Sequence, residues 1–264
     1  MAPSAHSVAA LALLALALLV GLAEKSQAVP EDSSIAYPGQ FPWHAAVFQA
    51  SPSTLLGSGI LVGSQYVLTA ASTVTDKSAA DVRVLLGELT TAKGGNVAVS
   101  AIKPHESWSA DSDENDIALL VLAGPVLASV TPVRLPARYY QGATYVDQTL
   151  SVTGWGTDDA GNTETYLSVS NLNVIRNREC QTLQNQNARL PWTKMCAVGT
   201  GPTPCKGDSG DPVVFLENDS KYTLVGILTK DTQCSTKRPS TITRITEFLD
   251  WISTASDGHI VIQN

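Results

Sequence analysis

Residues 205–214 read CKGDSGDPVV. The tetrapeptide Gly-Asp-Ser-Gly at 207–210 consists of residues that favour tight turns, and a strand-like Pro-Val-Val run follows it closely. On its own the tetrapeptide is a weak signal, because such residues gather in many turns. Its meaning depends on the motifs that accompany it elsewhere in the chain.

Four motifs precede it, in the order PGQFPW (38–43), VLTAA (67–71), NDIALL (115–120) and VTGWG (152–156). Together the five closely resemble the trypsin/chymotrypsin-like serine proteases, in the form seen in arthropod gut and haemolymph members. The resemblance covers residues 30–255. It implies an all-β fold of two antiparallel β-barrels packed face to face, with the active cleft between them and a C-terminal helix.

The residue pattern independently predicts many short strands separated by Gly, Pro, Asn and Asp, as in antiparallel barrels or sandwiches. One convincing helix is expected near the end, where Phe248, Trp251 and Ile252 recur at helical spacing. The expected strands are 59–62, 66–68, 82–86, 97–102, 117–122, 150–153, 212–216, 222–228 and 240–244.

Residues 1–28 are expected to be a signal peptide. Residues 8–23 form an unbroken apolar run, too short for a typical membrane span, and the small residues Ser26 and Ala28 suit a cleavage site. A retained membrane anchor is the alternative. Cleavage after Ala28 would leave Val29 as the mature terminus. Its ammonium group is a candidate partner for Asp208, and a disordered acidic terminus is the favoured alternative. Residues 29–264 are then expected to form one trypsin-like domain, with its two barrels dividing near residue 135.

The composition is that of an ordinary globular protein: 44% hydrophobic and 16% charged, with a net charge of −7. Because Lys and Arg are scattered and the net charge is negative, neither nucleic acid nor an anionic membrane is an expected partner. After signal removal we expect no membrane association. An unidentified secreted protein is the expected partner.

The resemblance implies that Asp116 is the orienting carboxylate and Ser209 the nucleophile, with the N–H groups of Gly207 and Ser209 forming the oxyanion hole. In the family the catalytic histidine directly follows Thr-Ala-Ala, but this position is Ser72 here. A serine hydroxyl does not accept a proton near neutral pH and cannot become a cation that Asp116 would stabilise. We therefore expect a catalytically inactive chain.

No other histidine is expected to substitute. His44 follows Trp43 on an expected strand of the first barrel, His105 lies in a surface loop, and His259 lies in the C-terminal tail. Each is interpreted as a solvated or hydrogen-bonded structural residue.

The substrate cleft departs from the family pattern as well. The usual Ser-Trp-Gly edge is replaced by Thr-Lys-Asp at 229–231, and Asp211 replaces the second glycine of Gly-Asp-Ser-Gly-Gly-Pro. The pocket-floor position is expected to be Thr203, which lacks the carboxylate with which a trypsin binds Lys or Arg. The residues expected around the cleft are Thr203, Lys206, Thr229, Lys230, Asp231 and Ser240.

Four cysteines, an even number in a chain expected to be secreted, predict two disulfides, and no metal-type Cys spacing is present. The resemblance implies the pairs Cys180–Cys196 and Cys205–Cys234. Two family cysteines that flank the catalytic histidine are replaced together, by Gly57 and Thr73. We expect no metal and no cofactor.

The favoured function is a secreted, catalytically inactive homologue that acts by protein binding, for example as a cofactor in an immune or proteolytic cascade. One alternative is a low-activity serine endopeptidase that uses Ser209 with a substitute base. The other is a structural component of a secretion. Asn218, in the sequon Asn-Asp-Ser, is a candidate glycosylation site.

Overall fold

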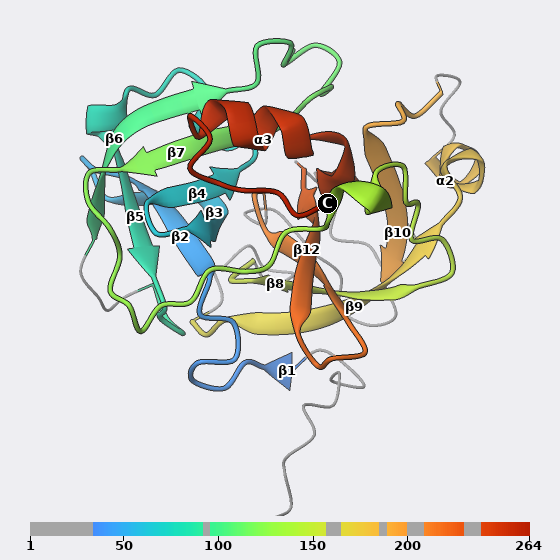
Figure 1. Ribbon diagram of the computed structural model, residues 1–264, viewed down its shortest axis with the longest axis horizontal. Coiled ribbons are helices and arrows are strands. Elements are labelled where there is room, and N and C mark those ends of the chain that lie inside the picture. Colours follow the sequence, from blue (N-terminus) through green and yellow to red (C-terminus); the bar gives the residue numbers. More distant parts are fainter. Residues whose placement is uncertain (1–33, 92–95, 157–164, 185–188, 200–208, 230–238) are drawn as a thin grey trace, which may run out of the picture.

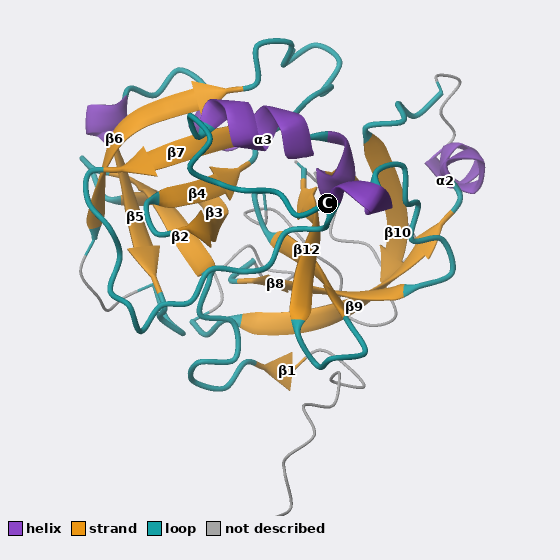
Figure 2. Cartoon of the chain, in the orientation of Figure 1, coloured by secondary structure: helices purple, strands orange, loops and turns teal. Residues whose placement is uncertain are grey.

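The computed structural model describes residues 34–91, 96–156, 165–184, 189–199, 209–229 and 239–264 (Figure 1). Within these ranges the chain forms two antiparallel β-barrels, side by side, which confirms the predicted fold class (Figure 2). Short turn-bounded strands rich in Val, Ile and Leu supply both barrels.

The first barrel is closed by six strands in the spatial order β2-β3-β4-β7-β6-β5. Closure pairs β2 with both β3 and β5, so the barrel has no open edge. The strands are β2 (His44–Gln49), β3 (Thr54–Gly63), β4 (Tyr66–Thr69), β5 (Val82–Leu86), β6 (Val97–Pro104) and β7 (Ala118–Leu122).

The second barrel follows the order β9-β10-β13-β12-β11-β8 and closes because β8 also pairs with β9. The short strand β1 (Ser34–Ile35) adds to the outside of β9. The six barrel strands are β8 (Thr149–Gly154), β9 (Ser168–Ile175), β10 (Lys194–Gly199), β11 (Pro212–Leu216), β12 (Tyr222–Leu228) and β13 (Ser240–Arg244).

The segment between β7 and β8 ties the two barrels together. Val133 donates its N–H to the carbonyl of Leu61 in the first barrel at 3.0 Å, while the Arg134 carbonyl accepts from Leu224 in the second at 2.9 Å. The predicted C-terminal helix is α3 (Leu249–Ala255), and it lies over the first barrel (Figure 1). Lys103 of β6 reaches its end, donating to the Ala255 carbonyl at 2.7 Å.

A second helix, α2 (Asn177–Gln184), corrects the expectation of a single convincing helix. Its sequence, NRECQTLQ, is mostly polar and Cys180 is its one buried residue. No apolar stripe at helical spacing was therefore available to predict it. Four 3₁₀ turns complete the described helical segments: Ala71–Val74, Ala79–Asp81, Arg138–Tyr140 and Ile245–Glu247.

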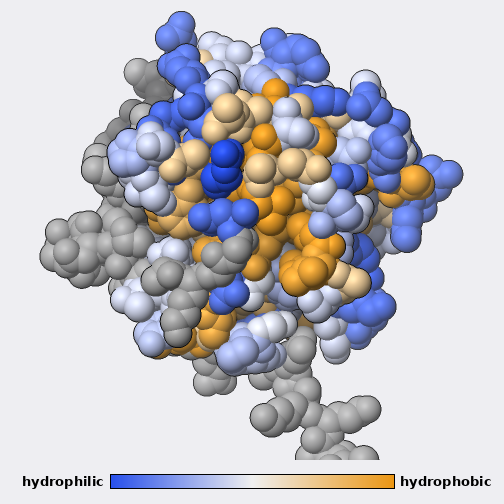
Figure 3. Space-filling model, turned by 90° about the vertical axis from the view of Figure 1, so that its left-hand side faces the viewer, coloured by the Kyte–Doolittle hydropathy of each residue, from blue (hydrophilic) through white to orange (hydrophobic). Residues whose placement is uncertain are grey.

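Each barrel has an apolar core, with Leu61, Leu68 and Leu119 fully buried in the first and Leu172 and Ile242 in the second. The side of the first barrel also carries apolar residues at its surface, gathered in the middle of that face and ringed by hydrophilic ones (Figure 3). In the described part of the chain, no helix is long and apolar enough to span a membrane.

Candidate active site

Ser72 lies on the 3₁₀ turn after β4 and bonds the carboxylate of Asp116, which precedes β7. The Ser72 backbone N–H donates to Asp116 Oδ1 at 2.7 Å, and its hydroxyl donates to Oδ2 at 2.8 Å. Because β4 and β7 are paired neighbours, the barrel register brings these two residues together although 44 positions separate them.

Ser209, just before β11, meets this pair from the second barrel. Its Oγ lies 3.4 Å from Ser72 Oγ and 3.1 Å from Thr73 Oγ1. The Ser209 carbonyl accepts the N–H of Ser58 on β3 at 2.9 Å, which fixes its backbone against the first barrel. The predicted trio of Ser72, Asp116 and Ser209 therefore forms one cluster between the barrels.

Sequence reasoning missed the contact of Thr73 with Ser209. The contact is possible because residue 57 is a glycine. A Cβ at this position would lie 3.0 Å from Thr73 Cγ2 and would collide with the Ser209 carbonyl oxygen. Gly57 and Thr73 therefore face each other beside Ser209, with the Thr73 side chain in the space between them. The paired loss of two cysteines was the only signal in the sequence that linked these positions.

Asp116 is only 1% exposed, and its burial raises the pKa of its carboxyl group. The two Ser72 bonds and the positive charge of the buried Lys194 act in the opposite direction. The Thr243 hydroxyl donates to the Asp116 carbonyl at 3.1 Å and holds the backbone in place. A buried carboxylate with two donors is thus well anchored.

The chemical capacity of this cluster is limited by its composition. Among the described residues, the side chains in hydrogen-bonding contact with Ser209 are the hydroxyls of Ser72 and Thr73. Hydroxyls donate and accept hydrogen bonds but hold no useful fraction of base near neutral pH.

His44 sits in the interior rather than at Ser209. It is 1% exposed, with Nδ1 2.7 Å from Thr153 Oγ1 and Nε2 3.1 Å from Ser58 Oγ. Burial lowers the pKa of its imidazole to about 3. Asp211 Oδ1 lies 3.8 Å from Nε2, beyond hydrogen-bonding distance, so its favourable effect on a protonated ring is smaller than the cost of burial.

The other two histidines in the described part of the chain, His105 and His259, pack against aromatic side chains. His105 packs its ring against Phe248 and Trp251, and burial lowers its pKa. His259 has Nδ1 2.8 Å from the Ser256 carbonyl and stacks on Tyr66.

The sequence also did not predict that His44 and Asp211 lie close together. Asp211 is 1% exposed, and its carboxylate lies so close to Gly154 that no side chain fits there. The exchange of a family glycine for aspartate was visible in the sequence. Its proximity to His44, from the other barrel, depends on how the barrels pack.

The cleft residues are partly described. Thr229 is buried and its hydroxyl donates to the Thr241 carbonyl at 2.9 Å. Ser240 is buried at the start of β13, paired with Ala197 of β10. The other predicted cleft and oxyanion residues, with the predicted Cys205–Cys234 bridge, lie outside the described residues: Thr203, Lys206, Gly207, Lys230 and Asp231.

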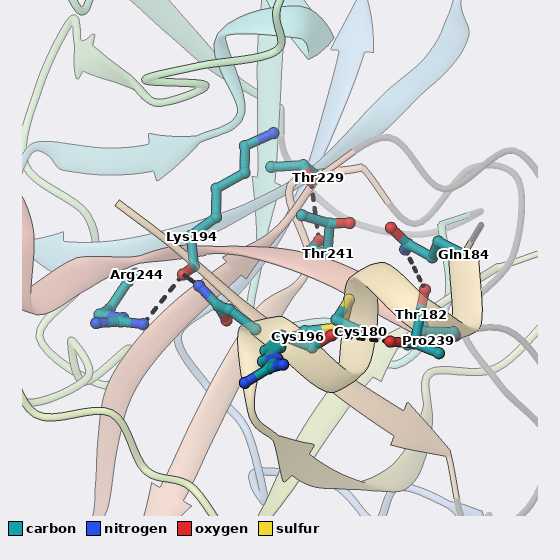
Figure 4. The surroundings of a disulfide bond; sticks show 11 residues. Cys180, Thr182, Gln184, Lys194, Cys196, Thr229, Pro239, Thr241 and Arg244 are labelled. Atoms are coloured by element: carbon teal, nitrogen blue, oxygen red, sulfur yellow. Dashed lines mark hydrogen bonds between the residues drawn. A yellow bond between two sulfur atoms is a disulfide. The ribbon is translucent and has the colours of Figure 1, made fainter. Parts of the chain in front are cut away.

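A disulfide joins Cys180 of α2 to Cys196 of β10, with 6.1 Å between their Cα atoms (Figure 4). Gln184, at the end of α2, donates to the Pro239 carbonyl at 3.0 Å, directly before Ser240. The helix is thereby held against the second barrel. Over the described ranges, no group of three or more His, Cys, Asp or Glu residues is arranged to hold a metal ion.

The comparisons with known proteins agree with this architecture. The family model described as Trypsin matches residues 32–252. The chain is 29% identical over 235 residues to the proclotting enzyme of Tachypleus tridentatus, a match that covers 81% of this chain and 63% of that protein. It is 28% identical over 225 residues to transmembrane protease serine 11C of Mus musculus, covering 83% of this chain and 51% of that protein.

The chain thus spans between about half and two thirds of the length of these relatives. Since the family model extends over most of the sequence, and the two closed barrels bring Asp116 and Ser209 together between them, the chain belongs to the trypsin family.

Proposed function

We propose that this chain is a secreted, catalytically silent member of the trypsin family that acts by binding another protein. The observation that carries the proposal is the position of Ser72, whose hydroxyl contacts both Asp116 and Ser209. In the family this place between carboxylate and nucleophile belongs to a histidine.

A serine at this place removes the proton-transfer step. The Ser209 hydroxyl needs a base to take its proton and an acid to protonate the leaving amine. In a serine protease of another fold, loss of the histidine alone lowers turnover by about 2 × 10⁶. The catalysis that remains from an oxyanion hole and binding is roughly 10³–10⁴ over water, too slow for physiological proteolysis.

Weak endopeptidase activity is the second candidate, supported by the survival of Ser209 and Asp116 in one hydrogen-bonded cluster. A base supplied by the substrate, such as a histidine side chain, would then have to activate Ser209. The structural explanation of the same residues is simpler: Asp116 anchors the turn that carries Ser72, and the Ser209 backbone bonds β3.

The role of a cofactor in a proteolytic cascade draws support from the similarity to the proclotting enzyme. Secretion is part of the proposal and rests on the apolar run within residues 1–28. Asn218 is exposed in the turn between β11 and β12, where an oligosaccharide could attach without disturbing a strand.

The test uses the secreted mature protein beside its Ser209→Ala variant. We expect no detectable cleavage of casein or of peptide substrates by either protein, and no labelling of Ser209 by a fluorophosphonate. Turnover within a hundredfold of an ordinary trypsin, lost in Ser209→Ala, would contradict the proposal and favour the endopeptidase.

A further inference from the structure

A pocket of about 1040 Å³ opens beside α2, and Ser72, Asp116 and Ser209 are not among its lining residues. Its walls come from the loop before β7, the loop before β8, the end of β9 and the start of α2, the segment leading into β10, and the end of β13. We call it the α2 pocket. Arginines and apolar side chains form much of its lining.

Arg244, at the end of β13, lines this pocket and is only 7% exposed. Its Nη2 donates to the Lys194 carbonyl at 3.0 Å (Figure 4), while its buried Nε has no hydrogen-bond partner in the described structure. Leaving a buried donor unsatisfied costs about 1–3 kcal/mol. The Lys194 carbonyl therefore uses only part of the hydrogen-bonding capacity of this guanidinium.

Further guanidinium groups stand at the rim. Arg176 and Arg189 line the α2 pocket and are exposed. A smaller pocket of about 420 Å³ shares Asn177 and Arg189 with it and adds Arg178. Guanidinium groups bind carboxylates through two parallel hydrogen bonds, so this surface suits acidic side chains.

The pocket also offers apolar contact. Trp192 is 66% exposed, and it stands beside Leu190 and Pro191 in the same wall. Tryptophan and arginine are both enriched among the residues that contribute most to binding energy in protein interfaces.

Acidic residues in the wall of the α2 pocket limit how much negative charge a ligand can carry. Glu114 and Asp147 are also part of the wall, and the whole chain has a net charge of −7. A strongly charged polyanion would be repelled, whereas a segment with one or two carboxylates beside apolar side chains would be accommodated.

We propose that the α2 pocket binds a peptide segment of a partner protein in which an acidic side chain adjoins an apolar one. The carboxylate pairs with the guanidinium groups of Arg244 and Arg189, and the apolar side chain packs on Trp192. The proposal goes beyond the catalytic silence of the cleft, because it holds whether or not Ser209 reacts.

The pocket adjoins the residues around Asp116. Glu114 and Asn115 directly precede Asp116, and Thr193 directly precedes Lys194, whose positive charge opposes the rise in the pKa of Asp116 that burial causes. A bound segment would therefore contact the chain neighbours of both residues. Binding at the pocket is thus placed to influence the cluster around Ser209.

The experiment selects phage-displayed random peptides on the folded mature protein. We expect enriched sequences with Asp or Glu next to an aromatic or aliphatic residue. For the best synthetic peptide, Arg189→Ala and Trp192→Ala should each weaken binding by about tenfold or more, and exchange of its acidic residue for the amide should do the same. The matched controls Arg83→Ala and Tyr139→Ala, on other surfaces, should leave binding unchanged.

Absence of enrichment, enriched peptides without an acidic residue, or binding that both pocket variants retain would overturn the proposal. A heparin fragment tests binding of a polyanion. If it binds more tightly than the selected peptide and depends on the same residues, the pocket is a polyanion site instead.

Casein cleavage is measured on the same preparations. Activity there would refute the catalytic silence while leaving the peptide result intact, so the two failures are distinguishable.

Discussion

Ser72 and Asp116 are joined by two hydrogen bonds, from the Ser72 N–H to Oδ1 at 2.7 Å and from its hydroxyl to Oδ2 at 2.8 Å. Both oxygens of a nearly inaccessible carboxylate are thus satisfied by one residue. The arrangement gives Asp116 a structural task that does not depend on proton transfer.

Ser72→Ala should destabilise the protein in a pH-dependent way. Burial raises the pKa of Asp116 above its unfolded value, so ionisation of this group reduces stability as pH rises through that range, and the Ser72 bonds offset part of the loss. Removing the hydroxyl should cost about 1–3 kcal/mol at pH 7 and less at pH 3, because the raised pKa of Asp116 favours its protonated form under acidic conditions. Urea unfolding at both pH values measures the difference.

Thr75→Val is the matched control for this variant. Thr75 ends the same turn, and its hydroxyl donates to the Ala71 carbonyl at 3.2 Å rather than to a titrating group. Its effect on stability should be equal at the two pH values. A loss in Ser72→Ala that is likewise independent of pH would contradict the assigned bond.

His44 should make the protein sensitive to acid. Its pKa falls from 6.5 to about 3 on folding because of burial, so its contribution to stability is complete above pH 6.5 and is lost as pH falls toward 3. The total loss is on the order of 4–5 kcal/mol. His44→Gln should flatten this part of the stability curve, as measured by urea unfolding between pH 7 and pH 4, and an unchanged slope would refute the prediction.

Gly57→Ala should destabilise the protein by about 1–3 kcal/mol, since its Cβ would collide with the backbone oxygen of Ser209. Gly124→Ala is the control, because a Cβ there meets no atom within 4 Å. Thermal unfolding compares the two. Equal stability of the two variants would mean that the Ser209 backbone moves freely, contrary to its bond from Ser58.

The short apolar runs, whose bounds are local, predicted antiparallel strands in barrels or sandwiches, and the arrangement as two barrels was implied by the resemblance to the trypsin-like proteases. Strands β5, β11, β12 and β13 have the expected bounds. Helix α2 was not predictable, since one disulfide-bonded cysteine rather than an apolar stripe anchors it.

The cluster of Ser72, Asp116 and Ser209 could be named from ordered motifs. The contacts Thr73–Ser209 and His44–Asp211 each join the two barrels across more than a hundred residues. Such contacts depend on barrel packing, which no local pattern encodes. The α2 pocket is lined by five separate segments of the chain, so no local sequence pattern predicted it either.

Removal of the disulfide by Cys180→Ser with Cys196→Ser should cost about 2–4 kcal/mol, the range for a closed loop of this size, here with a sequence separation of 16. Because the bridge fixes α2 to β10, peptide binding at the α2 pocket should weaken as well. Urea unfolding and peptide titration measure the two effects. A stability equal to that of the parent protein would contradict the structural role of the bridge.

Ser72→His alone should not restore efficient proteolysis. An imidazole at this position would supply a base, but it would have to reach Ser209 Oγ where the Thr73 hydroxyl already contacts it at 3.1 Å. The substituted residues Lys230, Asp231 and Ser240 remain in the sequence of the expected cleft. General acid–base catalysis contributes only when the substrate is held in position, so kcat/KM on peptide substrates should stay far below that of an ordinary trypsin.

The double variant Ser72→His with Ser209→Ala gives the background rate. Efficient, Ser209-dependent cleavage by the single variant would show that the cleft still accepts substrate and that the histidine was the sole loss.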